Sequence, residues 1–321
     1  MKLMQFGTLP IKVSEIGFGT SQLANTDNQY VGVKYLSKIE AKNILQRAID
    51  LGINFFDTSP TYGTAEKLVG EFKQKYKDKL IVSTKAGLKP DGTRDFSTTF
   101  LRQQVERSLK SLQVDCLDIF QLNKPSKKDF ENIDLFNFLT ELKHQGKIKY
   151  SGVIVGEVEA GYECIESGNV DCLQIFYNFL YQDTEDLILK ANNRGLGVLA
   201  RSPLNSGLLT GVYKRDQVFD PNDARATFFT GKSFTQRLEI LRKIQNDLNI
   251  SDSQIKEFSL RFILSNRCRT IAIPATSTTH QIEELINIAN DPSRFSSSEL
   301  DNIKRVVSQY MNQVNFQQQI L

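Results

Sequence analysis

The chain of 321 residues has no tryptophan, only two histidines and only four cysteines, and each scarcity excludes a class of protein. With His144 and His280 alone, a histidine-rich metal site is excluded, because such a site needs several imidazole ligands. The four cysteines show no CxxC spacing, which argues against a zinc site or a disulfide framework. We expect reduced, mostly buried thiols in a cytoplasmic protein.

Long apolar runs and blocks of like charge are also missing. No run approaches the roughly 20 apolar residues that span a bilayer, and the N-terminus lacks the apolar core of a signal peptide. The 40 basic and 37 acidic residues are dispersed along the chain, so neither nucleic acid nor a membrane is an expected partner. The nearest approach to a basic cluster, residues 73–79, is interpreted as a solvated helix end.

Short apolar, β-branched runs alternate with amphipathic helical patterns, which is typical of parallel β/α proteins. Helical patterns such as 39–51 and 98–112 separate the runs, and no GxGxxG follows the first strand, which argues against a doubly wound open sheet. We therefore predict a single (β/α)8 TIM-barrel domain over residues 1–321. The eight predicted strands are Ile16–Thr20, Ile53–Asp57, Leu80–Lys85, Cys116–Leu122, Ser151–Val155, Asp171–Phe176, Gly197–Ala200 and Thr270–Ile273.

Three further segments complete the predicted barrel. Residues 3–13 form a predicted hairpin, placed as a plug at the end of the barrel opposite the active site. Residues 202–232 form a long loop after the seventh strand, and such loops are usually functional. Residues 296–310 form an extra C-terminal helix, capped by a serine with glutamate three positions later.

The ends of two successive strands carry the strongest chemical signal. Asp57 and Tyr62 follow the second strand and Lys85 ends the third, and in a barrel such strand ends meet at the active site. A tyrosine titrates near pH ~10, and a neighbouring ammonium, held by a carboxylate, lowers that value. Together the three residues predict a tyrosine general acid/base, although each alone is more often a solvated loop residue.

The motifs GINFFDTSPTYG (residues 52–63), IVSTK (residues 81–85) and ARSPLNSGLLTG (residues 200–211) resemble those of the aldo-keto reductase superfamily, in a bacterial-type form. The resemblance covers nearly the whole chain. It implies hydride transfer between NAD(P)H and an aldehyde or ketone, with Tyr62 as general acid. By the resemblance, the catalytic residues are Asp57, Tyr62, Lys85 and Asn123, and the cofactor-binding residues are Gly19, Thr20, Gln174, Arg201, Ser202, Leu204, Ser206, Thr276, Ser277, Gln281 and Glu284.

The chain departs from the family's pattern at three places. Asn123 stands where the family usually has a catalytic histidine, so slower chemistry is expected. Ile154 replaces a serine that would hold the nicotinamide carboxamide. The bases that usually meet the 2′-phosphate of NADP are absent, because Ala275, Ser277 and Gln281 stand in their places. NADP(H) is the family's usual cofactor, and these substitutions make NAD(H) a serious alternative.

Three functions therefore stay open at the level of sequence. The first is an active reductase of small-molecule carbonyl substrates. The second is a cofactor-binding regulatory or sensor protein with little turnover, and the third is a sugar-biosynthesis enzyme on the same barrel. Tyr30, Tyr35, Phe228 and Phe229 are candidate walls of the substrate pocket. The oligomeric state is left open, with a monomer possible.

Overall fold

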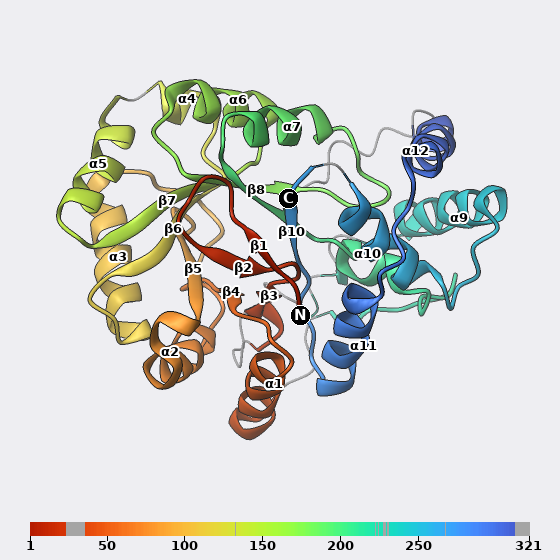
Figure 1. Ribbon diagram of the computed structural model, residues 1–321, viewed down its shortest axis with the longest axis horizontal. Helices are drawn as coiled ribbons and strands as arrows, with labels where there is room; N and C mark the ends of the chain where they lie inside the picture. Colours follow the sequence, from red (N-terminus) through yellow and green to blue (C-terminus); the bar gives the residue numbers. More distant parts are fainter. Residues whose placement is uncertain are drawn as a thin grey trace.

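A computed structural model describes residues 1–23, 36–131, 133–221, 223, 225–226, 229, 231–266 and 268–311. Eight parallel strands form one sheet in the order β10-β9-β8-β7-β6-β5-β4-β3 (Figure 1). The two outer strands also meet, because the amides of Gly17 and Gly19 donate to the carbonyls of Ala272 and Pro274 at 2.9 and 2.8 Å. These contacts close the sheet into the predicted (β/α)8 barrel.

All eight predicted strands are present, with small differences at their ends. One difference is at β7, which begins three residues before the predicted Ser151, because Ile148 and Tyr150 pair with Leu117 and Ile119 of β6. The barrel strands are β3 (Phe18–Gly19), β4 (Phe55–Asp57), β5 (Ile81–Ala86), β6 (Leu117–Asn123), β7 (Ile148–Ile154), β8 (Cys172–Phe176), β9 (Gly197–Arg201) and β10 (Thr270–Ile273).

Helices surround the barrel (Figure 1), and each packs with a face of buried apolar residues. In α1, for example, Ala41, Ile44, Leu45 and Ala48 are buried at helical spacing. The helices are α1 (Lys38–Asp50), α2 (Ala65–Tyr76), α3 (Thr98–Leu112), α4 (Lys127–Phe130), α5 (Ile133–His144), α6 (Val158–Ser167), α7 (Glu185–Asn193), α9 (Gly231–Leu248), α10 (Ile255–Ser265), α11 (Thr279–Asn290) and α12 (Ser297–Met311), with 3-10 turns η1 (Thr20–Leu23), η2 (Lys77–Lys79) and η3 (Asn205–Thr210).

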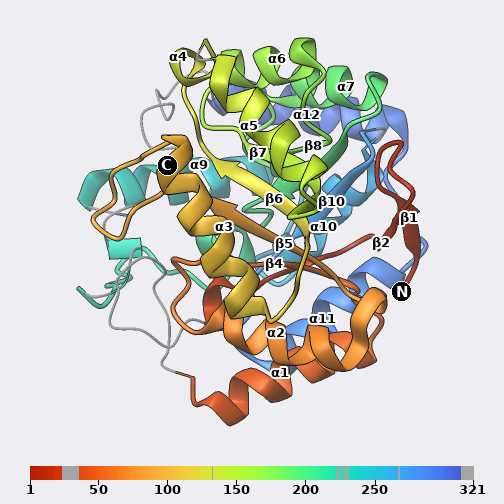
Figure 2. The ribbon, with the colours of Figure 1, turned by 90° about the vertical axis from the view of Figure 1, so that its left-hand side faces the viewer.

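The predicted N-terminal hairpin is formed by β1 (Leu3–Gln5) and β2 (Lys12–Ser14), and it covers one end of the barrel. Phe6 is only 1% exposed and its ring lies 6.0 Å from that of Phe55, at the first residue of β4. Gly197, which opens β9, leaves room for this ring, because a Cβ there would lie 2.6 Å from it. Figure 2 shows the hairpin at one end of the barrel and α9 at the other.

The interpretation of residues 73–79 as a wholly solvated helix end is wrong at Lys73. This side chain is buried, and its ammonium donates to Asp118 Oδ2 and to the carbonyl of Leu80, both at 2.6 Å. The helical position of Lys73 faces the start of β5 and β6, so the basic run is solvated only beyond it. Sequence pattern alone did not show that the Asp118 carboxylate lies opposite.

The C-terminal helix α12 begins as predicted, because Ser296 Oγ accepts the amide of Glu299 and the Glu299 carboxylate accepts the amide of Ser296. The predicted loop 202–232 is less irregular than expected, since it contains η3 and ends where α9 begins at Gly231. Within the described residues, none of the helices combines the length and apolar character that crossing a bilayer would require.

Candidate active site

A buried ion pair lies where β4 and β5 end. Lys85 Nζ donates to Asp57 Oδ2 at 2.5 Å and to the carbonyl oxygen of Thr58 at 2.7 Å. Asp57 and Lys85 are only 4% and 3% exposed, so each charge depends on the other for compensation. Both residues end apolar runs of their strands, which explains why the sequence pattern was sufficient to locate them.

The second oxygen of the Asp57 carboxylate is held by two amides. Gln121 Nε2 and Gln174 Nε2 donate to Asp57 Oδ1 at 3.2 and 3.0 Å. The Gln174 amino group thus donates to the ion pair, and the carbonyl oxygen of the same side chain can accept a hydrogen bond from a ligand. Gln121 was missed by the sequence analysis, although a glutamine inside the apolar run LDIFQLN is the signal that could have found it.

Tyr62 lies in the turn between β4 and α2, beside this ion pair. The Lys85 ammonium is 5.2 Å from the centre of its ring. Burial raises the pKa of Tyr62 above its ordinary value, and the opposing charges of Lys85 and Arg201 only partly offset that effect. The expected net lowering of the pKa by Lys85 is therefore wrong, because the lysine charge is already engaged by Asp57 and desolvation dominates.

Strand pairing places Asn123, Ile154 and Gln174 side by side. Asn123 pairs in register with Ile154, and Ile154 pairs with Gln174. Ile154 is 3% exposed, so the end of β7 presents a buried aliphatic side chain between two amides. Among the described residues, no hydrogen-bond partner is found for the Asn123 side chain, which is half-buried at the mouth of the barrel.

Arg201 is the last residue of β9, and its guanidinium lies over the ring of Phe176 at 4.9 Å. Its Nε and Nη2 atoms are buried without a hydrogen-bond partner in the structure. Burial lowers the pKa of Arg201 to about 10, and Tyr62 acts in the opposite direction. An unsatisfied, desolvated guanidinium at the strand ends offers hydrogen-bond donors to an anionic ligand and a flat face to a planar one.

The segment after β9 turns sharply because three non-glycine residues adopt left-handed backbone angles. Ser202, Asn205 and Ser206 have φ values of 55°, 45° and 52°. Asn178 stabilises the turn, since its Nδ2 donates to the Ser202 carbonyl at 3.1 Å, and Leu204 begins the turn of η3. Backbone amides in such turns form concave anion sites, so the predicted phosphate-binding residues lie in a suitable conformation.

The side of the site opposite the segment after β9 is formed by β3 and by the segment after β10. Thr20 Oγ1 donates to the Asp57 carbonyl at 3.1 Å, which ties η1 to the ion pair. A Cβ on Gly19 would lie 3.4 Å from the carbonyl oxygens of Ile273 and Pro274, so the backbones approach closely there. Thr276 is buried, and its Oγ1 has no partner in the structure.

The remaining predicted cofactor residues lie at the start of α11. The side chain of Gln281 folds back and accepts the amide of Ser277 at 3.0 Å. Glu284 pairs with Lys256 at 2.7 Å, while His280 is largely exposed, as expected, and lies 3.8 Å from Glu284. Lys256, which reaches this helix face, is therefore already paired with a carboxylate.

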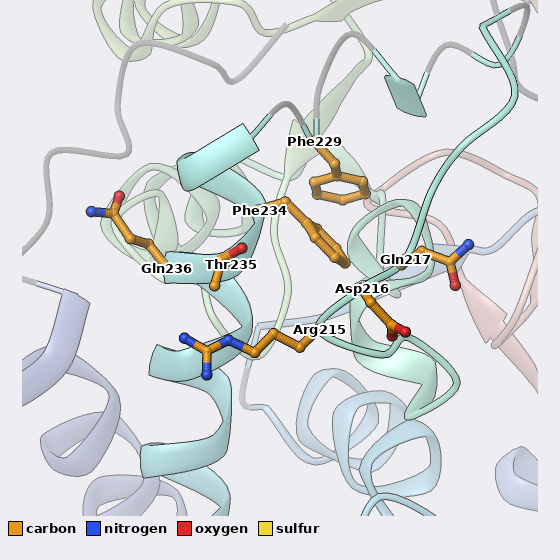
Figure 3. Close-up of a pocket in the computed structure, with 7 residues that line it drawn as sticks. All are labelled: Arg215, Asp216, Gln217, Phe229, Phe234, Thr235 and Gln236. Atoms are coloured by element: carbon orange, nitrogen blue, oxygen red, sulfur yellow. The ribbon is translucent and has the colours of Figure 1, made fainter.

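A cavity of about 490 Å³ lies away from these residues, between the segment after η3 and the start of α9. Figure 3 shows Phe229 and Phe234 on one side of it and Arg215 and Asp216 on the other. Phe229, a candidate wall of the substrate pocket, lines this cavity and also packs in an aromatic cluster with Phe219 and Tyr213. The predictions for Tyr30, Tyr35 and Phe228 lie outside the described residues.

Metal-binding chemistry has no support in the described part of the chain. No group of three or more histidine, cysteine, aspartate or glutamate side chains there could hold an ion. The four cysteines are unpaired, and Cys164, Cys172 and Cys268 are buried as expected. Burial raises the pKa of each of these thiols, which leaves them unreactive.

Comparison with known proteins identifies the family. A model of the aldo/keto reductase family matches residues 15–308. An aldo-keto reductase of Strobilurus tenacellus is 32% identical over 290 residues, covering 87% of this chain and 84% of that protein. The NADH-specific methylglyoxal reductase of Escherichia coli is 26% identical over 314 residues, covering 90% and 94% of the two chains.

Solved structures share the same architecture. The glycerol dehydrogenase of Gluconobacter oxydans superposes with a TM-score of 0.77 at 23% identity, covering 96% of this chain and 95% of that one. This likeness confirms the barrel with its N-terminal hairpin and C-terminal helices. Because the family model spans most of the barrel and the sequence relatives match over nearly their whole length, the chain belongs to the aldo-keto reductase family of NAD(P)H-dependent oxidoreductases.

Proposed function

We propose that the protein reduces the carbonyl group of a small aldehyde or ketone to an alcohol, with Tyr62 as the general acid. The observation that carries this proposal is the position of the Tyr62 ring beside the Lys85 ammonium, which Asp57 holds in place. A phenol, a charged ammonium and a carboxylate at one barrel mouth are the groups that proton transfer by a tyrosine requires.

The residues at the mouth fit a nicotinamide dinucleotide. Gln174 has a free carbonyl oxygen for the carboxamide, Arg201 presents an unsatisfied guanidinium, and the left-handed turn of Ser202 and Ser206 offers backbone amides to the pyrophosphate. Thr276 adds a buried hydroxyl without a partner. When bound, the dinucleotide supplies the hydride, as in other nicotinamide-dependent enzymes.

The direction of the Tyr62 pKa shift suits a proton donor. Because burial raises that pKa, the phenol stays protonated at neutral pH and can donate to the oxygen that gains charge during reduction. The phenolate left behind is stabilised by the positive charges of Lys85 and Arg201. The Asn123 amide can donate a second hydrogen bond to the same oxygen without itself titrating.

For the cofactor, we propose that NADH is used at least as well as NADPH. A 2′-phosphate at the start of α11 would meet Ser277 and Gln281, whose side chain already covers the Ser277 amide, and the carboxylate of Glu284. A dianion without a cationic partner binds weakly. The Escherichia coli relative, named as NADH-specific, supports the same preference.

The test uses purified protein, a panel of aldehydes and both cofactors. Fluorescence titration with NADH and NADPH gives the two dissociation constants directly. Tyr62→Phe should then bind cofactor normally and lose turnover about 10²- to 10⁴-fold, the range for general acid catalysis. Tyr76→Phe, in α2, is the matched control, since Tyr76 lies outside the site and bonds Gln46. Unchanged turnover in Tyr62→Phe would refute the assignment.

One observation favours a second candidate, a nucleotide-binding regulatory protein with little turnover. Ile154 lies buried beside Gln174, where it offers a nicotinamide carboxamide no hydrogen bond. An unpaired amide in such a place costs about 1–3 kcal/mol. Tight nucleotide binding together with no reduction of any carbonyl in the panel would support this candidate and exclude the reductase. Ile154→Ser should then tighten binding, whereas Ile154→Val should not.

A further inference from the structure

The left-handed turn after β9 is held by the hydroxyl of Tyr213, which lies in the segment that follows η3. Tyr213 Oη donates to the carbonyl oxygen of Ser206 at 2.7 Å. Ser206 has φ of 52°, a conformation that is unfavourable for a non-glycine residue and persists only where its surroundings fix it. Gly207 makes room for the hydroxyl, because a Cβ there would lie 2.5 Å from Tyr213 Oη. The phenol therefore fixes the backbone at Ser206.

The hydroxyl of Tyr213 is itself held by an ion pair. Arg225 Nη1 donates to Tyr213 Oη at 3.0 Å. On its other edge, Arg225 Nε donates to the two carboxylate oxygens of Asp223 at 2.9 and 2.8 Å, and Nη2 also donates to Oδ2. Asp223 is only 8% exposed, and a planar fork on a buried carboxylate has a fixed geometry. Asp223 thus orients the guanidinium, and the guanidinium orients the phenol.

The ring of Tyr213 is fixed by packing that does not depend on the hydroxyl. Its centre lies 5.3, 6.0 and 5.9 Å from those of Phe219, Phe229 and Phe234, each in an edge-to-face arrangement. Figure 3 shows two of these rings, Phe229 and Phe234, side by side. Because a phenylalanine ring would keep the same neighbours, Tyr213→Phe removes the hydrogen bonds of the hydroxyl and leaves the aromatic cluster in place.

We propose that Tyr213 and Arg225 are positioning residues, which hold the turn at Ser206 in the conformation that binds the pyrophosphate of the dinucleotide. Neither side chain needs to touch the cofactor. Donation by Arg225 to the phenol strengthens the bond that the phenol donates to Ser206, since linked hydrogen bonds polarise one another. Without the hydroxyl, the turn is less often in its binding conformation, and the apparent affinity falls by that fraction. This inference rests on the proposed function, because it concerns the dinucleotide that supplies the hydride.

The first experiment measures binding without any turnover. Fluorescence titration with NADH should show a dissociation constant about 3- to 10-fold higher in Tyr213→Phe, the loss expected for one hydrogen bond. Calorimetric titration with ADP-ribose, which has the pyrophosphate and lacks the nicotinamide, should show the same loss. Tyr310→Phe is the matched control, because its hydroxyl also donates a hydrogen bond, to Asp247 at 2.7 Å, and joins α12 to α9. The control should bind as wild type does, and wild-type affinity in Tyr213→Phe would overturn the proposal.

A double-mutant cycle tests whether Arg225 acts through Tyr213. Asp223→Asn/Arg225→Gln removes both charges of the ion pair, so that no buried carboxylate is left without its cation. This variant should bind ADP-ribose more weakly than wild type. When it is combined with Tyr213→Phe, the affinity should fall no further, because the hydroxyl that the ion pair holds is already gone. If the two losses multiply instead, Arg225 acts on the cofactor directly and its positioning role is refuted.

Hydrogen exchange and steady-state kinetics distinguish positioning from a general structural role. In protein without cofactor, peptides spanning residues 202–211 should exchange faster in Tyr213→Phe than in wild type, and the rest of the barrel should not change. Saturating NADH should remove the difference. In turnover, KM for NADH should rise while kcat at saturating NADH stays unchanged. Faster exchange throughout the barrel, or a lower kcat at saturating NADH, would overturn the proposal.

The same measurements separate this inference from the proposed reduction. If Tyr213→Phe weakens the binding of NADH and ADP-ribose but wild type reduces no aldehyde, the positioning role stands and the reductase proposal fails. If wild type reduces aldehydes but Tyr213→Phe binds both ligands as wild type does, the positioning role is refuted and the reductase proposal stands.

Discussion

Removing the Lys85 charge tests the central argument about the buried ion pair. In Lys85→Met, the Asp57 carboxylate keeps its two amide donors, Gln121 and Gln174, and loses the cation that pairs with it in the described part of the chain. A buried carboxylate left without its partner costs about 3–5 kcal/mol. Since a domain is stable by about 5–15 kcal/mol, we expect a large fall in the free energy of unfolding.

A double-mutant cycle separates the free energy of the Asp57–Lys85 interaction from the effect of a general loss of packing. Asp57→Asn alone leaves the Lys85 ammonium buried with neutral acceptors and no carboxylate, so it should also cost about 3–5 kcal/mol. The double variant Asp57→Asn/Lys85→Met contains neither charge, and its cost should be no larger than that of either single variant. The coupling free energy is then about 3 kcal/mol or more, at the upper end for residues in contact.

Urea denaturation followed by circular dichroism measures all four proteins, with the slope m compared to confirm the same transition. Turnover gives a second reading, because removing Lys85 also removes one of the charges that lower the Tyr62 pKa. All three variants should therefore be inactive at neutral pH, although the double variant is stable. Additive costs in the cycle would refute the reasoning, since they would mean that the two charges do not compensate each other.

Three other substitutions test packing, capping and buried charge, each by urea denaturation against wild type. Burial raises the pKa of Glu66 above its ordinary 4.5, so its carboxyl favours folding below that pH and opposes it as pH rises. Glu66→Gln, whose oxygen can still accept the Thr84 hydroxyl, should stabilise the protein at pH 8 and not at pH 4; equal effects would contradict this. Gly70→Ala should cost about 1–3 kcal/mol, because the new Cβ would lie 2.8 Å from the backbone of Leu112, and a neutral result would mean that α2 and α3 can move apart. Ser296→Ala should cost about 0.5–2 kcal/mol through loss of the α12 cap, whereas Ser298→Ala, at the second residue of the helix, should cost less.

The strand-helix alternation was predictable because each element of a barrel has a local sequence signature. Buried parallel strands are short continuous apolar runs, and the helices between them carry apolar residues at three- and four-residue spacing. Asp57 and Lys85 were placed correctly for the same reason, as polar residues directly at strand ends. The hairpin plug was predictable from its turn and its alternating apolar residues.

Long-range pairings were not predictable. Lys73 has the sequence of a solvated helix end, and only the fold brings the Asp118 carboxylate to its ammonium. The sequence identifies Gln121 only as a strand residue, and its amide reaches Asp57 because the barrel brings β6 and β4 to the same interior. The Tyr62 pKa was expected to fall because Lys85 was considered alone, and the burial that reverses the shift depends on the surrounding elements.

The sequence by itself thus determined the barrel, the order of its elements and the identity of the Asp57, Tyr62 and Lys85 set, because these depend on local periodicity and on which residues end each strand. The tertiary structure decided how these groups interact. It placed the Lys85 charge on Asp57, buried Tyr62, and brought the amides of Gln121 and Gln174 to the same carboxylate. Charge compensation and desolvation depend on distances between residues far apart in the chain, and only the folded barrel fixes those distances.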